Sequence, residues 1–218
     1  MSEPSAASDP PVTQLILCDR RAEVVDAWRQ QFDECPEVDI REGDILECGA
    51  EALVVPGNAF GFLDRGLELE VCETLGWEIQ DALRAEVRGR FHGELLVGQA
   101  CFTPGKGPFH QILYTCLYRT PRKLRETVNA FLAVRGAFLA LGAPGAPAPR
   151  SVAIPGLGTG SSDLHPLISA RQLRYAYEIF SGRRGFGDKN LSQLARRERK
   201  LATLPRSALE TPDSESSP

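Results

Sequence analysis

The segment most able to do chemistry is a glycine-rich stretch that follows an apolar run. Residues 154–162 read Ile-Pro-Gly-Leu-Gly-Thr-Gly-Ser-Ser, and a helix is expected to open at Pro166. Glycines let the backbone approach a ligand and turn several N–H groups toward it, and a helix start adds free donors and partial positive charge. The stretch therefore suits a phosphate or diphosphate, although a glycine-rich turn without a ligand has the same pattern. The familiar nucleotide motifs do not explain it, because no Gly-Lys-Ser/Thr ends the loop and Ser161 stands where a third glycine would be.

Two further polar side chains stand at the expected carboxyl ends of strands. Asn58 follows the apolar run 52–55, and Asp44 follows the alternating run 38–40. Ligand contacts collect at this edge of α/β sheets. The amide of Asn58 can both donate to and accept from a sugar hydroxyl, and the carboxylate of Asp44 can accept from an exocyclic amine. Taken singly, each residue fits an ordinary turn equally well.

The elements that must position these residues alternate along the chain. Short apolar runs predict strands at 14–18, 38–40, 52–55, 94–97, 100–103, 111–116 and 151–154. Helical spacing predicts helices over 24–32, 67–75, 77–87, from Thr120-Pro121 to Leu141, and over 166–180. Strands that are apolar on both faces, alternating with helices, predict an α/β domain whose helices cover a mixed, largely parallel sheet.

Composition sets the broad class of the protein. The 218 residues are 42% hydrophobic and 25% charged, which predicts one globular domain. A net charge of -4 gives no reason to expect nucleic acid or an anionic membrane as the main partner. No apolar run approaches the ~20 residues of a membrane span and the start lacks a signal peptide, so we expect a cytoplasmic protein.

Both ends of the sequence are polar and are predicted to be tails, over residues 1–11 and 185–218. Within the second tail, residues 191–201 could form a short basic helix, either docked on the body or a partner or simply solvated.

The cysteines and histidines do not have metal-ligand spacing. No C-x-x-C or H-x-x-x-H pair occurs, and no Ser-His-Asp set can be nominated. We therefore expect neither a metal nor a cofactor, and we interpret the cysteines as reduced core thiols. These are Cys18, Cys35, Cys48, Cys72, Cys101 and Cys116.

Taken together in chain order, these segments resemble the macrodomain family. Gly43 to Leu46 reads Gly-Asp-Ile-Leu, Pro56 to Phe62 reads Pro-Gly-Asn-Ala-Phe-Gly-Phe, and Ile154 to Gly160 reads Ile-Pro-Gly-Leu-Gly-Thr-Gly. The resemblance runs from Val38 to Phe180 and is nearest to the bacterial and phage-associated macrodomains. It implies a three-layer α/β/α macrodomain over residues 12–184.

The first strand and helix resemble the unit that many macrodomains carry at their C-terminus. No apolar strand follows Phe180, so the resemblance implies a circularly permuted macrodomain. In that arrangement the strand Leu15 to Cys18 would insert parallel to a central strand.

The resemblance also implies an ADP-ribose cleft. Asp44 would hold the adenine amino group, Ile45 would add a backbone contact, and Cys18 and Asp19 would border the adenine. Asn58 would face the distal ribose. Two walls would hold the diphosphate, one formed by Arg65, Gly66 and Leu67 and the other by Gly156, Gly158, Thr159, Gly160 and Ser161.

Several residues depart from the family's pattern. Arg65 stands beside a single glycine where family members carry paired or triple glycines, and it could pair with a phosphate or obstruct it. Glu68 occupies the position of an aspartate in hydrolytic relatives and could still activate water. Asp163 would repel a diphosphate if it pointed inward. Tyr114 and Tyr118 could line the cleft or belong to the core.

Three functions are consistent with this pattern. The leading one is a macrodomain that binds ADP-ribose or a related nucleotide diphosphate as a reader of ADP-ribosylated macromolecules, with nucleic acid a partner only if it carries the modification. The second is an ADP-ribosyl hydrolase with Asn58 and Glu68 as catalytic residues. The third is a degenerate macrodomain that serves as a structural or phage-assembly partner.

Overall fold

The computed structural model describes residues 14–185 and 190–204, and its centre is a six-stranded sheet. The strands are β1 (Gln14–Asp19), β2 (Val38–Glu42), β3 (Ala52–Asn58), β4 (Ala100–Pro104), β5 (Gln111–Tyr118) and β6 (Ser151–Ile154). They lie in the order β2-β1-β6-β3-β5-β4, and every neighbouring pair is parallel except β4 and β5. The predicted mixed, largely parallel sheet is confirmed.

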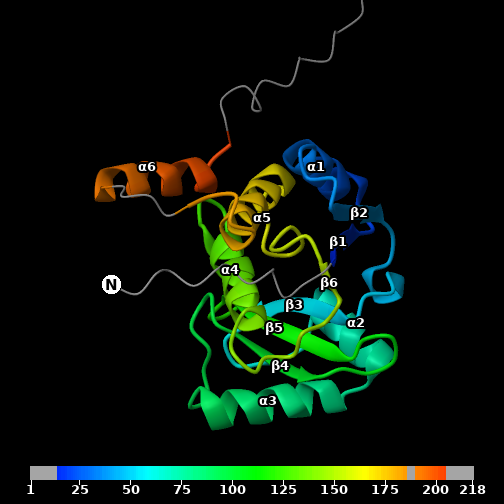
Figure 1. Ribbon diagram of the computed structural model, residues 1–218. Helices are drawn as coiled ribbons and strands as arrows, with labels where there is room; N and C mark the ends of the chain where they lie inside the picture. Colours follow the sequence, from blue (N-terminus) through cyan, green and yellow to red (C-terminus); the bar gives the residue numbers. More distant parts are fainter. Residues whose placement is uncertain (1–13, 186–189, 205–218) are drawn as a thin grey trace, which may run out of the picture.

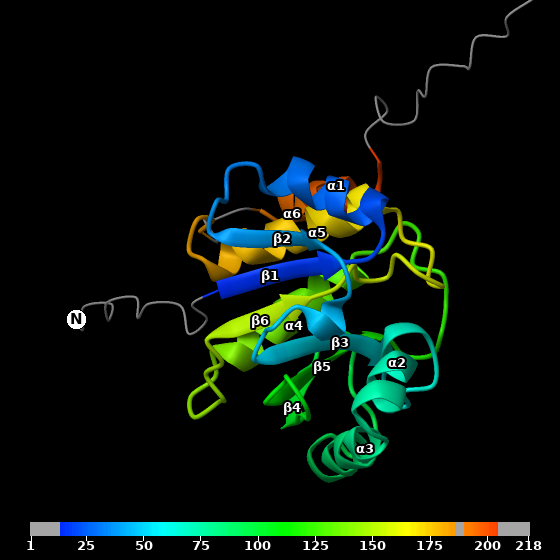
Figure 2. The ribbon, with the colours of Figure 1, turned by 90° about the vertical axis from the view of Figure 1, so that its right-hand side faces the viewer.

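Helices cover both faces of this sheet. They are α1 (Ala22–Phe32), α2 (Gly66–Leu75), α3 (Glu78–Arg90), α4 (Asn129–Leu141), α5 (Pro166–Phe180) and α6 (Leu191–Ala202), with a short 3-10 turn, η1, at Ile45–Glu47. One hydrophobic core joins the sheet to α1, α4 and α5, and a second joins its other face to η1, α2 and α3 (Figures 1 and 2). The three-layer α/β/α architecture is therefore confirmed.

The N-terminal strand lies inside the sheet rather than at its edge. β1 runs parallel to both neighbours, with Leu15 opposite Val38 on β2 and opposite Val152 on β6. Its alternate side chains enter different cores, Leu17 on one face and Ile16 on the other. The strand is apolar on both faces because helices cover both sides of the sheet, and its place beside a central strand is the one that the macrodomain resemblance implies. Circular permutation stays a prediction.

Two predicted elements differ in the structure. α4 begins at Asn129 instead of Thr120-Pro121, because the preceding segment is held to the glycine-rich loop: Leu124 is fully buried and its N–H donates to the Ser162 carbonyl at 2.8 Å. Residues 94–97 form no strand. There Leu95 is buried and its N–H donates to the Ala59 carbonyl at 2.8 Å, while the Leu96 side chain is 67% exposed.

The basic segment near the C-terminus forms α6, which contacts α5 through its C-terminal half. Leu201 is buried, and its carbonyl accepts from the Gln172 side chain on α5 at 3.1 Å. Leu191 and Leu194, at the other end of α6, are exposed. This helix is therefore docked at one end and solvated at the other. Among the described residues, no helix combines the length and apolarity that a membrane crossing would need.

Candidate functional site

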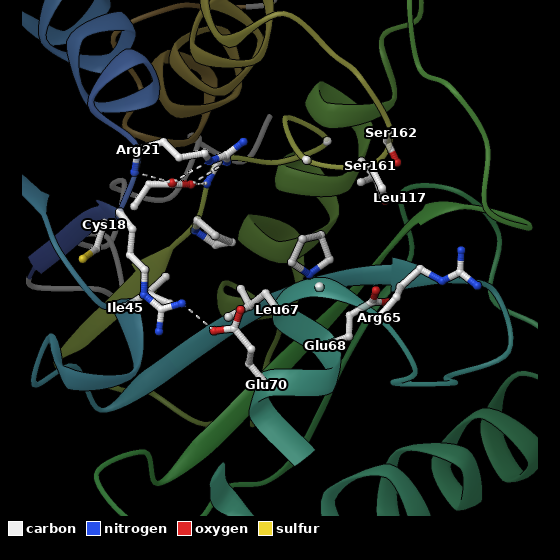
Figure 3. Close-up of a pocket in the computed structure, with 18 of the residues that line it drawn as sticks. Cys18, Arg21, Ile45, Arg65, Leu67, Glu68, Glu70, Leu117, Ser161 and Ser162 are labelled. Atoms are coloured by element: carbon white, nitrogen blue, oxygen red, sulfur yellow. Dashed lines mark hydrogen bonds and ion pairs between the residues drawn. The ribbon is translucent and has the colours of Figure 1, made fainter. Parts of the chain in front are cut away.

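A cleft of about 420 Å³ opens where the parallel strands end. The carboxyl ends of parallel strands meet at one edge of a sheet, and side chains or loops that follow β1, β2, β3, β5 and β6 gather there. Most of the predicted site residues line this cleft: Cys18, Asp19, Asp44, Ile45, Arg65, Gly66, Leu67, Glu68, Gly156, Gly158, Gly160 and Ser161. The sequence therefore predicted residues that the fold brings together from distant segments (Figure 3).

The glycine-rich loop is fixed from behind by an ion pair at the end of β1. Arg21 pairs with Asp19 at 2.9 Å and donates to the Thr159 carbonyl at 2.7 Å. The Thr159 hydroxyl in turn donates to the Gly156 carbonyl at 2.9 Å. A Cβ on Gly156 would lie 2.8 Å from Asp19 Oδ2 and 2.7 Å from Thr159 Oγ1, so only glycine fits. Thr159 thus shapes the loop and does not line the cleft.

The two helix starts at the cleft differ in what they offer. At α5, His165 Nδ1 accepts from the Leu167 N–H at 3.2 Å, so this donor is already used. At α2, Arg65 makes no side-chain capping bond, and Gly66 opens the helix with a φ of +52°. The first N–H groups of a helix have no partner within the helix. The structure therefore leaves the start of α2 free to meet an anion.

A chain of exposed ion pairs crosses one end of the cleft. Arg20 joins Asp44 at 2.6 Å and Glu70 on α2 at 2.9 Å. The other oxygen of Asp44 accepts from the Leu46 N–H at 2.9 Å and caps η1. Although burial raises the pKa of Asp44, the hydrogen bonds from Arg20 and Leu46 lower it below its ordinary value. Asp44 is therefore an ionised carboxylate at this end.

The opposite end of the cleft holds a buried carboxyl group. Glu68 is 5% exposed, and its Oε1 has no hydrogen-bond partner. Burial and the nearby Asp64 raise the pKa of Glu68 to about 8, while Arg65 and the Asn58 backbone N–H act in the opposite direction. At neutral pH this side chain is predominantly protonated.

Asn58 lies beside the cleft but does not line it. It is 5% exposed, its Nδ2 donates to the Phe62 carbonyl at 2.6 Å, and its Oδ1 accepts from the N–H groups of Phe60 and Phe62 at 3.0 and 3.2 Å. The amide therefore closes the loop after β3. The predicted contact with a ribose would have to use the second N–H of Nδ2, because the oxygen already accepts two bonds.

Neither of the two suspected obstructions fills the cleft. Arg65 pairs with Asp64 at 3.1 Å, and its side chain extends away from Leu67 (Figure 3). Asp163 does not line the cleft and forms ion pairs with Arg125 and, at 3.7 Å, with Lys123. Asp163 therefore lies outside the cleft, whereas Arg65 is part of its lining.

Sequence reasoning missed Arg20, Arg21 and Glu70. The two arginines directly follow the first strand, and this position at a strand end was a usable signal. Glu70 carried no such signal. Of the two tyrosines, Tyr118 at the end of β5 lines the cleft, whereas Tyr114 is fully buried in the core. Across residues 14–185 and 190–204, no group of three or more potential ligands could hold a metal ion.

Comparisons with known proteins identify the fold. No protein-family model matches the sequence, and no curated protein matches it significantly. The macrodomain of Mycobacterium tuberculosis DarG matches with a TM-score of 0.53 and 22% identity over 65% of this chain and 90% of that one. An Oceanobacillus iheyensis macrodomain with ADP matches with a TM-score of 0.52 and 17% identity, over 73% of this chain and 84% of that one. A variant of the Oceanobacillus iheyensis macrodomain with ADPR matches with a TM-score of 0.51 and 17% identity, over 73% of this chain and 86% of that one. With its helical layers, sheet and cleft in this arrangement, the chain has the macrodomain fold.

Proposed function

We propose that this protein binds ADP-ribose in the cleft. The observation that carries the proposal is the pair of backbone walls at the carboxyl edge of the sheet, formed by the start of α2 and the loop 155–162. Solved macrodomains with ADP and with ADPR share this fold, which supports the same class of ligand here.

The diphosphate would lie between the two walls. Backbone N–H groups at an uncapped helix start bind anions, and the macrodipole adds positive potential there. Gly158 has a φ of +75°, a conformation that favours glycine and turns the loop back on itself. Because Arg21, Asp19 and Thr159 already hold this loop in place, little ordering would be required on binding.

The adenine would lie at the end that Asp44 and Arg20 occupy. Asp44 is an acceptor for an exocyclic amine, but its Oδ2 is paired with Arg20. Arg20 is exposed, and exposed ion pairs contribute little free energy, so it can move aside for a base.

Two observations favour binding over hydrolysis. In this conformation the Glu68 carboxyl group is buried and its pKa is raised to about 8, so only a minor ionised fraction could act as a general base at neutral pH. The Asn58 amide oxygen accepts two bonds and its nitrogen donates one, all within its own loop. We therefore propose a reader, and release of ADP-ribose from a modified protein or nucleic acid would instead establish the hydrolase.

Isothermal titration with ADP-ribose tests the proposal. Wild-type protein should bind, and Gly156→Ala should weaken binding about tenfold or more, because the new methyl group displaces the loop. Gly89→Ala, where a Cβ meets open space on α3, is the matched control and should leave affinity unchanged. Absence of heat and of a thermal shift at millimolar ADP-ribose would overturn the proposal and favour the structural or phage-assembly role.

A further inference from the structure

The Glu68 side chain is the one polar group of the cleft whose placement the binding proposal does not yet explain. It lies in the first turn of α2, directly after Gly66 and Leu67, and it is buried. A carboxylate is favourable at a helix start, yet here it would stand beside the phosphates of the proposed ligand. An ionised Glu68 and the neighbouring phosphates would therefore repel each other.

The surroundings of Glu68 compensate a negative charge only in part, through Arg65 and the Asn58 backbone N–H. Its Oε1 has no hydrogen-bond partner, and a Cβ on Gly57 would lie only 2.0 Å from it. The neighbouring Tyr114 hydroxyl donates instead to the Asn58 carbonyl, at 2.7 Å. The nearest cation, Arg65, is ion-paired with Asp64 and partly exposed. A buried charge without a partner is far more costly than a buried neutral carboxylic acid.

We propose that ADP-ribose binds to the form of the protein in which Glu68 is a neutral carboxylic acid. This inference rests on the proposed function and adds the protonation state that the site requires. The neutral group removes the repulsion toward the diphosphate. Ionisation of Glu68 would restore that repulsion, so binding and deprotonation oppose each other.

The pKa values of Glu68 and of the groups around it define the pH range in which the affinity for ADP-ribose should fall. The pKa of Glu68 is raised to about 8, mainly by burial and by Asp64. The other titratable groups that face it are Arg65, Cys72, Tyr114 and Tyr118. Burial raises the pKa of Tyr118 to about 12, and it also raises the pKa values of Tyr114 and Cys72 above their ordinary values. At the far end of the cleft, burial raises the pKa of Cys18 to about 11. A loss of affinity centred near pH 8 therefore points to Glu68.

The experiment is calorimetric titration of ADP-ribose from pH 6 to pH 10 with wild-type protein and Glu68→Gln. The affinity of the wild type should fall at least about tenfold between pH 7 and pH 9.5, because only the protonated form binds well. Glutamine cannot ionise and keeps a hydrogen-bond donor. The affinity of Glu68→Gln for ADP-ribose should therefore change by no more than about twofold between pH 7 and pH 9.5. The exposed carboxylate of Glu73, on the same helix, provides the matched control: Glu73→Gln should fall with pH as the wild type does.

A second variant tests the inference without altering Glu68. Asp64→Asn removes the charge that raises the Glu68 pKa and frees Arg65, which lowers it. The fall in affinity should therefore begin at lower pH than in the wild type. A pH-independent wild-type affinity, or a parallel fall in Glu68→Gln, would overturn this inference and leave ADP-ribose binding intact. Absence of ADP-ribose binding at every pH would overturn the proposed function as well.

Discussion

The two ends of the cleft both present carboxyl groups, but in opposite electrostatic states. At one end Asp44 is ion-paired with the exposed Arg20, and the hydrogen bonds it accepts lower its pKa. At the other end Glu68 is buried without a cation, and desolvation raises its pKa to about 8. The same functional group is a charged acceptor in one place and a neutral acid in the other. Burial and partners, rather than residue type, decide which chemistry a carboxyl group can do.

The largest expected effect concerns the stability of Glu68→Gln. Since the Glu68 pKa is raised from its ordinary 4.5 to about 8, the folded wild type binds a proton that the unfolded chain releases in this range. The contribution of Glu68 to stability is fully present below pH 4.5 and is lost as pH rises through about 8. Relative to the wild type, Glu68→Gln should therefore gain on the order of 3 kcal/mol between pH 4.5 and pH 8.5. Urea denaturation across this range measures the difference.

A difference that stays constant with pH would show that Glu68 is ionised in the folded protein, and would remove the contrast between the two ends. Glu70→Gln, on the exposed side of the same helix, is the control and should track the wild type closely.

The next effect comes from the packing around the buried acid. A Cβ on Gly57 would lie 2.0 Å from Glu68 Oε1 and 2.3 Å from the Tyr114 hydroxyl oxygen. Gly57→Ala should therefore cost about 1–3 kcal/mol, the usual penalty for overpacking a core. Gly89→Ala, in an open position on α3, should be neutral or stabilising by up to about 1 kcal/mol because alanine favours helices. Equal unfolding free energies for the two variants would mean that Gly57 is not crowded.

The smallest effect is expected at the charged end. Arg20→Ala breaks the ion pairs to Asp44 and Glu70, whose side chains are 28% and 42% exposed. Exposed pairs contribute about 0–1 kcal/mol, so the unfolding free energy should change by less than about 1 kcal/mol. Removing Arg20 also frees Asp44 Oδ2, and ADP-ribose should bind at least as tightly. A loss of stability as large as that of Gly57→Ala would show that the charged end of the cleft contributes as much to the free energy of unfolding as the buried end.

The sequence predicted the fold where the signals were continuous. The strands at residues 14–18, 52–55 and 151–154 were found because a strand covered on both faces must be apolar throughout. The segment 120–128 was assigned to a helix because Thr-Pro is a good helix start. Its long-range bond to the glycine-rich loop, from Leu124 to Ser162, prevailed over that local preference.

The cleft itself was predictable because glycine patterns and strand ends are local properties of the chain. Gly66, Gly156 and Gly158 are required by backbone geometry or close approach, and such requirements appear directly as residue types. The burial of Glu68, the engagement of the Asn58 amide and the bridge from Arg20 to Asp44 and Glu70 depend on atoms that are distant in sequence. By itself the sequence determined most of the residues that meet at the edge of the sheet. Only the tertiary structure decided which of them are charged, which are already bonded and which stay available to a ligand, because desolvation and hydrogen-bond partners arise only once the chain is packed.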